Sequence, residues 1–344
     1  MSATSPPPDR PRLGLVPATD LRPARDAVLG ALQASGGTPT ALGEVAADAR
    51  RRLRETAAPG TAVARGWRVD GRDQVDLRWW PQGVVGLPGA PHLMLMSWYA
   101  KKLPWDRAGH GARVSVLDLR ARRYRHVLLV EPDAAGGFAP LPVHAGGLAV
   151  AGGFLHVAAT GGGLWAARLD DVVRLGSRDT VTRRTALGYR HVLPVQRRFA
   201  TPADTPGGRF RFSFVTTADD MLLAAEYTNS PTATKRIAAF PLVTSGPDAG
   251  LPAPAPATLL GDGVLRMQGI ERLTPAAGPD AGPYLLSVSQ GRTTRGSVVR
   301  GRPGAWTEER HALPMGCEDL TRHDDALWTV SEHPGVRWLA RLTP

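Results

Sequence analysis

Five polar residues each begin an apolar segment, and they recur at near-regular spacing: Gln82, His144, Arg211, Gln268 and Glu318. The intervals between them run from about 50 to 67 residues, and a four-stranded propeller blade takes about 40–50 residues, so one blade with its loops fits each interval. The first strand of every blade lines the central channel of a propeller. We therefore expect the five side chains to meet at one end of such a channel.

These residue types can support acid–base chemistry. His144 and Glu318 would act as base and acid, because a neutral imidazole and a carboxyl group in a partly dry site have pKa values pushed apart by their surroundings. Arg211 would hold a substrate carboxylate or phosphate, or else neutralise Glu318. Gln82 and Gln268 would hold polar substrate groups, or would only hydrogen-bond water and neighbouring strands.

The loops between second and third strands return to the same rim as these strand starts. They carry aromatic, acidic and histidine side chains. A concave site with an aromatic wall and a few convergent polar groups is the usual small-molecule pocket. The rim residues that we expect to bind substrate are Trp98, Tyr99, Glu226, Tyr227, Glu332 and His333.

From about residue 66 onward the sequence alternates with period two and is punctuated by turns, which is typical of an all-β chain. We predict a five-bladed β-propeller over 65–344, with six blades as the alternative because 174–208 has room for a degenerate blade. The last group of strands is one short, and the segment 73–80 would supply the missing strand and close the ring.

Helical patterns precede the propeller. Residues 1–18 are rich in proline and predict a disordered tail, and 19–64 predict a helical extension with helices over 19–35 and 40–57. The basic run Arg50–Arg54 then falls at the end of the second helix. Cations suit a helix C-terminus, so the run needs no ligand.

The net charge is +11, and nearly all of the positive charge is arginine. Scattered arginine in a chain rich in Ala, Gly and Pro reflects composition, so the charge argues only weakly for a nucleic-acid partner. No export signal or membrane-spanning run is evident, which predicts a cytoplasmic protein without a membrane partner. The one cysteine, Cys317, excludes an internal disulfide, and we expect it to be buried rather than nucleophilic.

Metal and cofactor signals are weak. No His/Cys cluster has zinc spacing, and the glycines at 161–163 do not form a phosphate loop. His144, Glu318 and Asp319 are possible ligands for a channel cation such as Ca²⁺, which needs six to eight oxygens. We expect no cofactor.

Several of these segments, in order and at similar intervals, resemble a family of actinobacterial, usually secreted, propeller-like proteins of undetermined function. The likeness spans about 79–343, and it implies the propeller fold and the rim residues but no reaction. Unlike that family, this chain lacks an export signal and carries the helical extension, which suggests a role in specialised metabolism. The segments are Trp80–Val84, Ser97–Tyr99, Val116–Leu119, Tyr124–Val130, His144–Gly147, Arg211–Val215, Gln268–Gly269, Glu318–Leu320 and Glu332–Gly335.

Two functions fit these observations. The first is a non-redox enzyme that acts on a small organic molecule by hydrolysis, elimination or cyclisation in a pocket at the top of the channel. The alternative is a non-catalytic module that binds a glycan, peptide or protein through exposed aromatic side chains such as Trp98, Tyr99 and Trp105.

Overall fold

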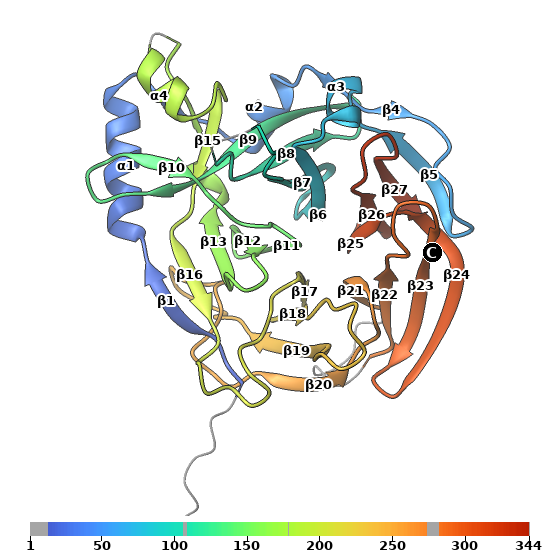
Figure 1. Cartoon of the computed structure of the whole chain (residues 1–344). Helices are drawn as coiled ribbons and strands as arrows, with labels where there is room; N and C mark the ends of the chain where they lie inside the picture. The colour runs from blue at the N-terminus through green and yellow to red at the C-terminus, as the bar shows by residue number, and fades with distance from the viewer. Residues whose placement is uncertain (1–12, 106–108, 178, 274–281, 344) are drawn as a thin grey trace, which may run out of the picture.

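The computed structural model describes residues 13–105, 109–177, 179–273 and 282–343. In this part of the chain the strands form five sheets around a central axis (Figure 1). The first strands of the sheets contact one another in a closed ring, so the predicted all-β propeller class is confirmed. In ring order these inner strands are β6 (Trp79–Leu87), β25 (Cys317–His323), β21 (Met267–Arg272), β17 (Phe214–Ala218) and β11 (Leu148–Ala151).

Four of the sheets have the four or five strands of a regular blade. One contains β11, β12 (Phe154–Ala158), β13 (Leu164–Arg168), β16 (Arg197–Ala200) and β1 (Val16–Asp20). The next contains β17, β18 (Met221–Ala225), β19 (Arg236–Pro241) and β20 (Thr258–Asp262). A third contains β21, β22 (Tyr284–Val288), β23 (Arg295–Arg302) and β24 (Ala305–Met315). The last contains β25, β26 (Ala326–Ser331), β27 (Trp338–Leu342), β5 (Val63–Arg68) and β4 (Arg54–Glu55).

The remaining sheet is larger than a blade, with nine strands. The number of regular blades is therefore four, not the five or six predicted. The segment 174–208 forms no sixth blade, because its strands β15 and β16 join two different sheets. The main path of the large sheet is β6, β7 (Ala90–Ala100), β8 (Ala112–Asp118), β9 (Arg123–Pro132), β15 (His191–Pro194), β14 (Val173–Arg174) and β2 (Thr38–Pro39), and β3 (Arg51–Arg52) and β10 (Phe138–Pro140) also pair with β9.

The ring is closed by β5, which pairs with the C-terminal strand β27 and places Gly66 opposite Ala340. The prediction that 73–80 closes it is wrong. Asp70 accepts a hydrogen bond from the backbone N–H of Arg72 and begins the short helix α3 (Gly71–Val75). A helix cap at this point interrupts the alternation that suggested a strand, and the chain becomes extended again only at β6.

Helices are confined to short segments in the described residues, chiefly α1 (Arg22–Ala34) and α2 (Leu42–Ala47). A 3₁₀ turn at Leu169–Asp171 lies between β13 and β14, and α4 (Thr180–Thr185) lies between β14 and β15. None of them is long and apolar enough to cross a membrane. The predicted second helix is too long, because the chain after α2 forms β3 and β4. In the predicted tail, residues 1–12 lie outside the described residues, whereas Val16–Asp20 is strand β1 and pairs with β16.

Close packing at the axis depends on glycine. A Cβ added to Gly83 would lie 2.9 Å from the backbone of Gly147, and one added to Gly269 would lie 2.3 Å from the backbone nitrogen of Leu320. Both distances are below those that real Cβ atoms adopt, so only glycine lets neighbouring inner strands approach this closely. The hydrophobic core fills the spaces between the sheets.

Candidate functional site

Three inner strands carry an irregularity at the same relative position. The register of β6 shifts between Pro81 and Val84, that of β21 between Met267 and Gly269, and that of β25 between Cys317 and Leu320. A bulge leaves residues unpaired and turns their side chains away from the regular alternation. The residues at these shifts include three of the five strand-start residues that we expected to meet at one end of the channel, namely Gln82, Gln268 and Glu318.

Each glutamine holds a glutamate. Gln268 Nε2 donates to Glu318 Oε1 at 3.1 Å, and Gln82 Nε2 donates to Glu332 Oε2 at 3.0 Å. Glu318 belongs to β25, and Glu332 directly follows β26 of the same sheet. Because β25 lies between β6 and β21 in the ring, the two glutamates of this sheet are held from both sides by its neighbours.

The two carboxyl groups influence one another. Burial raises the pKa of Glu318 well above its usual range, and the nearby charge of Glu332 adds to this effect. Burial also raises the pKa of Glu332, to about 7, although the Gln82 hydrogen bond and the positive charges of Lys101 and Arg337 oppose the shift. Two like charges in a partly dry site do not ionise together easily. At neutral pH the pair therefore holds at least one proton.

Two tyrosines lie close enough to respond to these carboxyl groups. Burial and the charges of Glu332 and Glu318 raise the pKa of Tyr99. Burial, Glu318 and Glu332 likewise raise the pKa of Tyr227, against the effect of Arg266. Both phenols are therefore neutral hydrogen-bonding groups beside the glutamates.

His144 reaches the rim through Tyr99. The two rings stack with their centroids 4.2 Å apart, and desolvation lowers the pKa of the imidazole. Tyr99 and His144 also line a cavity of about 370 Å³ with Lys101, His110 and Val143. In the described part of the chain no hydrogen bond joins His144 to Glu318, so the predicted base and acid share a region without direct contact.

His333 faces the carboxylate oxygen of Glu332 that Gln82 does not contact. Its Nε2 lies 3.5 Å from Glu332 Oε1, and its ring meets the ring of Trp80 edge-on at 5.5 Å. Lys101 Nζ lies 4.3 Å from the centre of the same indole ring. Sequence reasoning placed His333 and Glu332 at the rim, but it missed Trp80 and Lys101.

Asp319 has a structural role at the axis. Its buried Oδ2 accepts hydrogen bonds from the backbone N–H groups of Val84 and Leu148, both at 3.1 Å, and so joins β25 to β6 and β11. The possible cation site of His144, Glu318 and Asp319 is not assembled, since no group of three His, Cys, Asp or Glu side chains in the described residues is placed to hold a metal ion. Cys317 is fully buried, as expected, and burial raises the pKa of its thiol.

Two predicted rim residues, Trp98 and Glu226, and one predicted strand-start residue, Arg211, lie elsewhere. Trp98 is fully buried and donates through Nε1 to Ser115 Oγ. Glu226 is also fully buried, in a bidentate ion pair with Arg236. Nη2 of the arginine lies 2.8 Å from Oε1 and its Nε lies 2.9 Å from Oε2. Arg211 donates to the carbonyl oxygen of Thr234. The charges that act on Glu318 are those of Glu332 and Asp319, so the hypothesis that Arg211 neutralises Glu318 is wrong.

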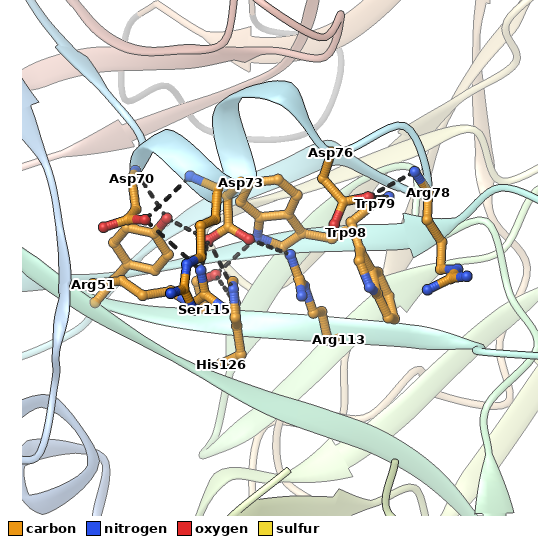
Figure 2. Close-up of polar contacts among 12 residues, drawn as sticks. Arg51, Asp70, Asp73, Asp76, Arg78, Trp79, Trp98, Arg113, Ser115 and His126 are labelled. Carbon is orange, nitrogen blue, oxygen red and sulfur yellow. Dashed lines mark hydrogen bonds and ion pairs between the residues drawn. The ribbon is translucent and has the colours of Figure 1, made fainter. Parts of the chain in front are cut away.

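A buried polar network explains the position of Trp98 (Figure 2). Ser115 Oγ lies 2.8 Å from His126 Nδ1, and His126 Nε2 lies 3.0 Å from Asp73 Oδ2. Asp73 also receives Tyr124 Oη–H and the guanidinium groups of Arg51 and Arg113. These residues come from α3, β3, β8 and β9, and their spacing in the sequence gives no signal of the cluster.

This network is not an arrangement for nucleophilic catalysis. Ser115 is fully buried and its Oγ already accepts the Trp98 N–H, so no substrate reaches it. Burial and Arg113 lower the pKa of His126 to about 4, and the ring is therefore neutral at pH 7. Burial opposes ionisation of Asp73, but His126, Arg113 and Arg51 outweigh it and hold the pKa of that carboxyl well below its usual range.

Comparison with known proteins identifies no family. No protein-family model and no curated protein matches the sequence. Among solved structures, a gluconolactonase from Xanthomonas campestris is 12% identical with a TM-score of 0.40, and the match covers 86% of this chain and 88% of that one. The soluble aldose sugar dehydrogenase of Escherichia coli is 12% identical with a TM-score of 0.38, covering 90% and 99%.

A further structural match is a putative glycosidase from Bacteroides thetaiotaomicron. It is 9% identical with a TM-score of 0.36, and the match covers 87% of this chain and 97% of that one. Scores and identities as low as these carry no information about the substrate of this chain.

Proposed function

We propose that this protein is a non-redox enzyme that acts on an uncharged small molecule by acid–base chemistry at the channel rim. The observation that carries the proposal is the buried glutamate pair, Glu318 and Glu332, each hydrogen-bonded to a glutamine from a neighbouring inner strand. Its cytoplasmic location and a place in specialised metabolism stay predictions from the sequence.

The two carboxyl groups suit complementary roles. A group that transfers protons works best when its pKa lies near the working pH, and the pKa of Glu332 is raised to about 7. Glu332 is therefore the base. Glu318, whose pKa is raised well above its usual range by burial and by the charge of Glu332, stays protonated and is the acid. Environments that separate two pKa values in this way assign acid and base.

This assignment changes the expected role of His144. Because His144 stacks on Tyr99 and Tyr99 responds to both glutamates, His144 is a positioning residue for the phenol. Tyr99 and Tyr227 would then hold polar groups of the substrate. His333, in contact with Glu332, would fix the orientation of the base.

The charge at the site limits the substrate. A partly ionised glutamate pair repels carboxylates and phosphates, whereas amide, phenol and carboxyl groups hydrogen-bond hydroxyl and carbonyl oxygens well. Hydrolysis of an ester, lactone or glycoside fits best among the reactions considered. Glu332 takes a proton from water, and the resulting hydroxide attacks the substrate. Glu318 gives its proton to the leaving oxygen. Solvent then restores both carboxyl groups.

The test is a panel of uncharged chromogenic esters, lactones and glycosides, assayed with the wild type and with Glu318→Gln and Glu332→Gln. Both variants should lower kcat/KM by at least about 100-fold, the usual contribution of one acid or base, while exposed Glu309→Gln should not. The wild-type kcat/KM should increase as the pH rises through about 7, because the base must lose its proton. Full activity in both glutamine variants, or a flat pH profile, would refute the proposal.

One observation favours the binding alternative. Trp105, in the loop after β7, is 71% exposed, and an isolated exposed indole is a common anchor for glycans and peptides. On that account a ligand from a glycan or peptide array would bind without turnover. Binding would survive Glu318→Gln but be lost in Trp105→Ala.

A further inference from the structure

A second cavity lies away from the channel, on the outer part of the nine-stranded sheet. Its volume is about 410 Å³, which is within the range of small-molecule sites. The chain segments around it are β3, β8, β9 and the region of α4, whereas the glutamate pair belongs to the inner strands. Six arginines line it: Arg50, Arg51, Arg113, Arg125, Arg183 and Arg190.

Carboxylates balance only part of this charge. Asp73 lies 3.1 Å from both Arg51 and Arg113. Asp48 lies 2.6 Å from Arg125 and 3.1 Å from Arg190.

Arg50 and Arg183 have no ion pair with a carboxylate in the described residues. Arg51 also lies 3.9 Å from Asp70. The cavity thus collects six guanidinium groups around three carboxylates, an excess of positive charge that attracts anions.

The base of the cavity is rigid and buried. Arg113 is 3% exposed, donates to Asp73 and to Tyr189 Oη at 2.9 Å, and stacks 4.2 Å from the centre of the Trp79 ring. Its Nε–H, like that of Arg125, has no hydrogen-bond partner among the described residues. A buried charged donor without a partner is costly. An anion in the cavity would offset that cost through its charge.

We propose that this cavity binds a small organic phosphate. A phosphoryl group has several acceptor oxygens, and guanidinium groups donate bidentate hydrogen bonds to them. Tyr189, which also lines the cavity and is partly exposed, provides aromatic surface for the organic part of the ligand. This cavity and the proposed catalytic site would bind different ligands, because the glutamate pair would repel the anion that the cavity binds. The phosphate site is therefore independent of the proposed catalytic function.

A nucleic-acid backbone carries the same phosphate chemistry, but the geometry favours a small ligand. Binding along a strand needs a continuous basic groove, whereas here Arg50 and Arg51 enter the cavity and the next arginines of that run, Arg52 and Arg54, line a different hollow. The earlier explanation of the run as a helix end is wrong, since α2 ends at Ala47.

The experiment is titration calorimetry of the full chain with pyrophosphate, ribose 5-phosphate and a single-stranded oligonucleotide, at constant ionic strength with chloride as the background anion. The wild type should bind ribose 5-phosphate saturably. Arg183→Gln should weaken binding about tenfold, the loss expected for one charge-assisted hydrogen bond. Arg184→Gln removes the same charge from the next residue of α4, which does not line the cavity, and should change the affinity less than twofold.

A second matched pair is Arg50→Gln with Arg52→Gln, for which the same contrast is expected. The proposal is overturned if ribose 5-phosphate does not saturate, if Arg184→Gln weakens binding as much as Arg183→Gln, or if the oligonucleotide binds more tightly than the small phosphates. Glu318→Gln and Glu332→Gln should leave this binding unchanged, so failure here and failure of the proposed function are separate results.

Discussion

At the scale of single residues, the site depends on how one carboxyl group is tuned. Burial raises the pKa of Glu332, while Gln82, Lys101 and Arg337 act in the opposite direction and keep it near 7. If these three residues opposed the shift more strongly, Glu332 would stay ionised at neutral pH. If they opposed it more weakly, Glu332 would stay protonated. Neither form would exchange protons readily at neutral pH.

Lys101 and Lys102 allow a controlled test of this tuning. Lys101→Gln removes a positive charge that favours the ionised form, so the pKa of Glu332 should rise, by roughly a few tenths of a pH unit as for other exposed charges. Lys102→Gln removes the neighbouring charge, which does not act on Glu332 in the same way. Carbon-13 NMR titration of labelled glutamate side chains measures both variants. Equal changes in the pKa of Glu332 in the two variants would show that the proposed local effect of Lys101 is wrong.

At the scale of elements, Asp319 connects three inner strands. Its Oδ2 takes the backbone N–H groups of Val84 and Leu148, at a point where the bulges of β6 and β25 leave the regular ladder open. Buried backbone N–H groups without partners are rare because they are costly. Asp319 thus supplies the acceptor for a backbone N–H group on each of its two neighbouring strands, β6 and β11.

Substitutions at Asp319 separate hydrogen bonding from charge. Asp319→Ala leaves two buried N–H groups without an acceptor and should lower the free energy of unfolding by about 3 kcal/mol. Asp319→Asn keeps the acceptor oxygen and should cost less than about 1 kcal/mol, because burial already favours the neutral form of this acid. Urea denaturation gives both values. An asparagine variant as unstable as the alanine variant would contradict this role.

Local patterns predicted the site only where the signal is local. Gln82, Gln268 and Glu318 were found because each begins an apolar strand at the same relative point. Trp98 was misplaced because β7 is buried over both faces, so alternation does not distinguish inside from outside. Pairing partners far apart in the sequence, such as Arg236 for Glu226, leave no trace in spacing.

At the scale of the whole molecule, the predicted fold class is confirmed but the predicted closure is not. Period-two segments and turns predict a propeller wherever they recur, since each blade is built locally. Closure joins segments about 270 residues apart, and the sequence suggested only 73–80 for it, whereas β5 at 63–68 closes the ring. The Asp70 cap begins a helix within 73–80, and the enlarged sheet arose because segments from the N-terminal extension and from the segment 174–208 added to β9.

A cross-strand disulfide tests this closure. Arg65 and Arg341 are paired residues of β5 and β27, so cysteines at both positions should form a disulfide. Oxidation should raise the free energy of unfolding by about 2–4 kcal/mol relative to the reduced form of the same variant. The pair Arg78→Cys and Arg341→Cys should not crosslink. If the pair at 78 and 341 crosslinked and the pair at 65 and 341 did not, the segment 73–80 would be the closing strand.

The central claim is that Gln82 and Gln268, at bulges of the inner strands, position Glu332 and Glu318 so that the charge of Glu332 raises the pKa of Glu318. The most direct measurement is the pH titration of the Glu318 carboxyl carbon by NMR in the wild type and in Glu332→Gln. The account predicts a midpoint well above the ordinary glutamate value in the wild type, and a lower midpoint in the variant because a like charge is gone. An ordinary midpoint, or one that Glu332→Gln leaves unchanged, would contradict it.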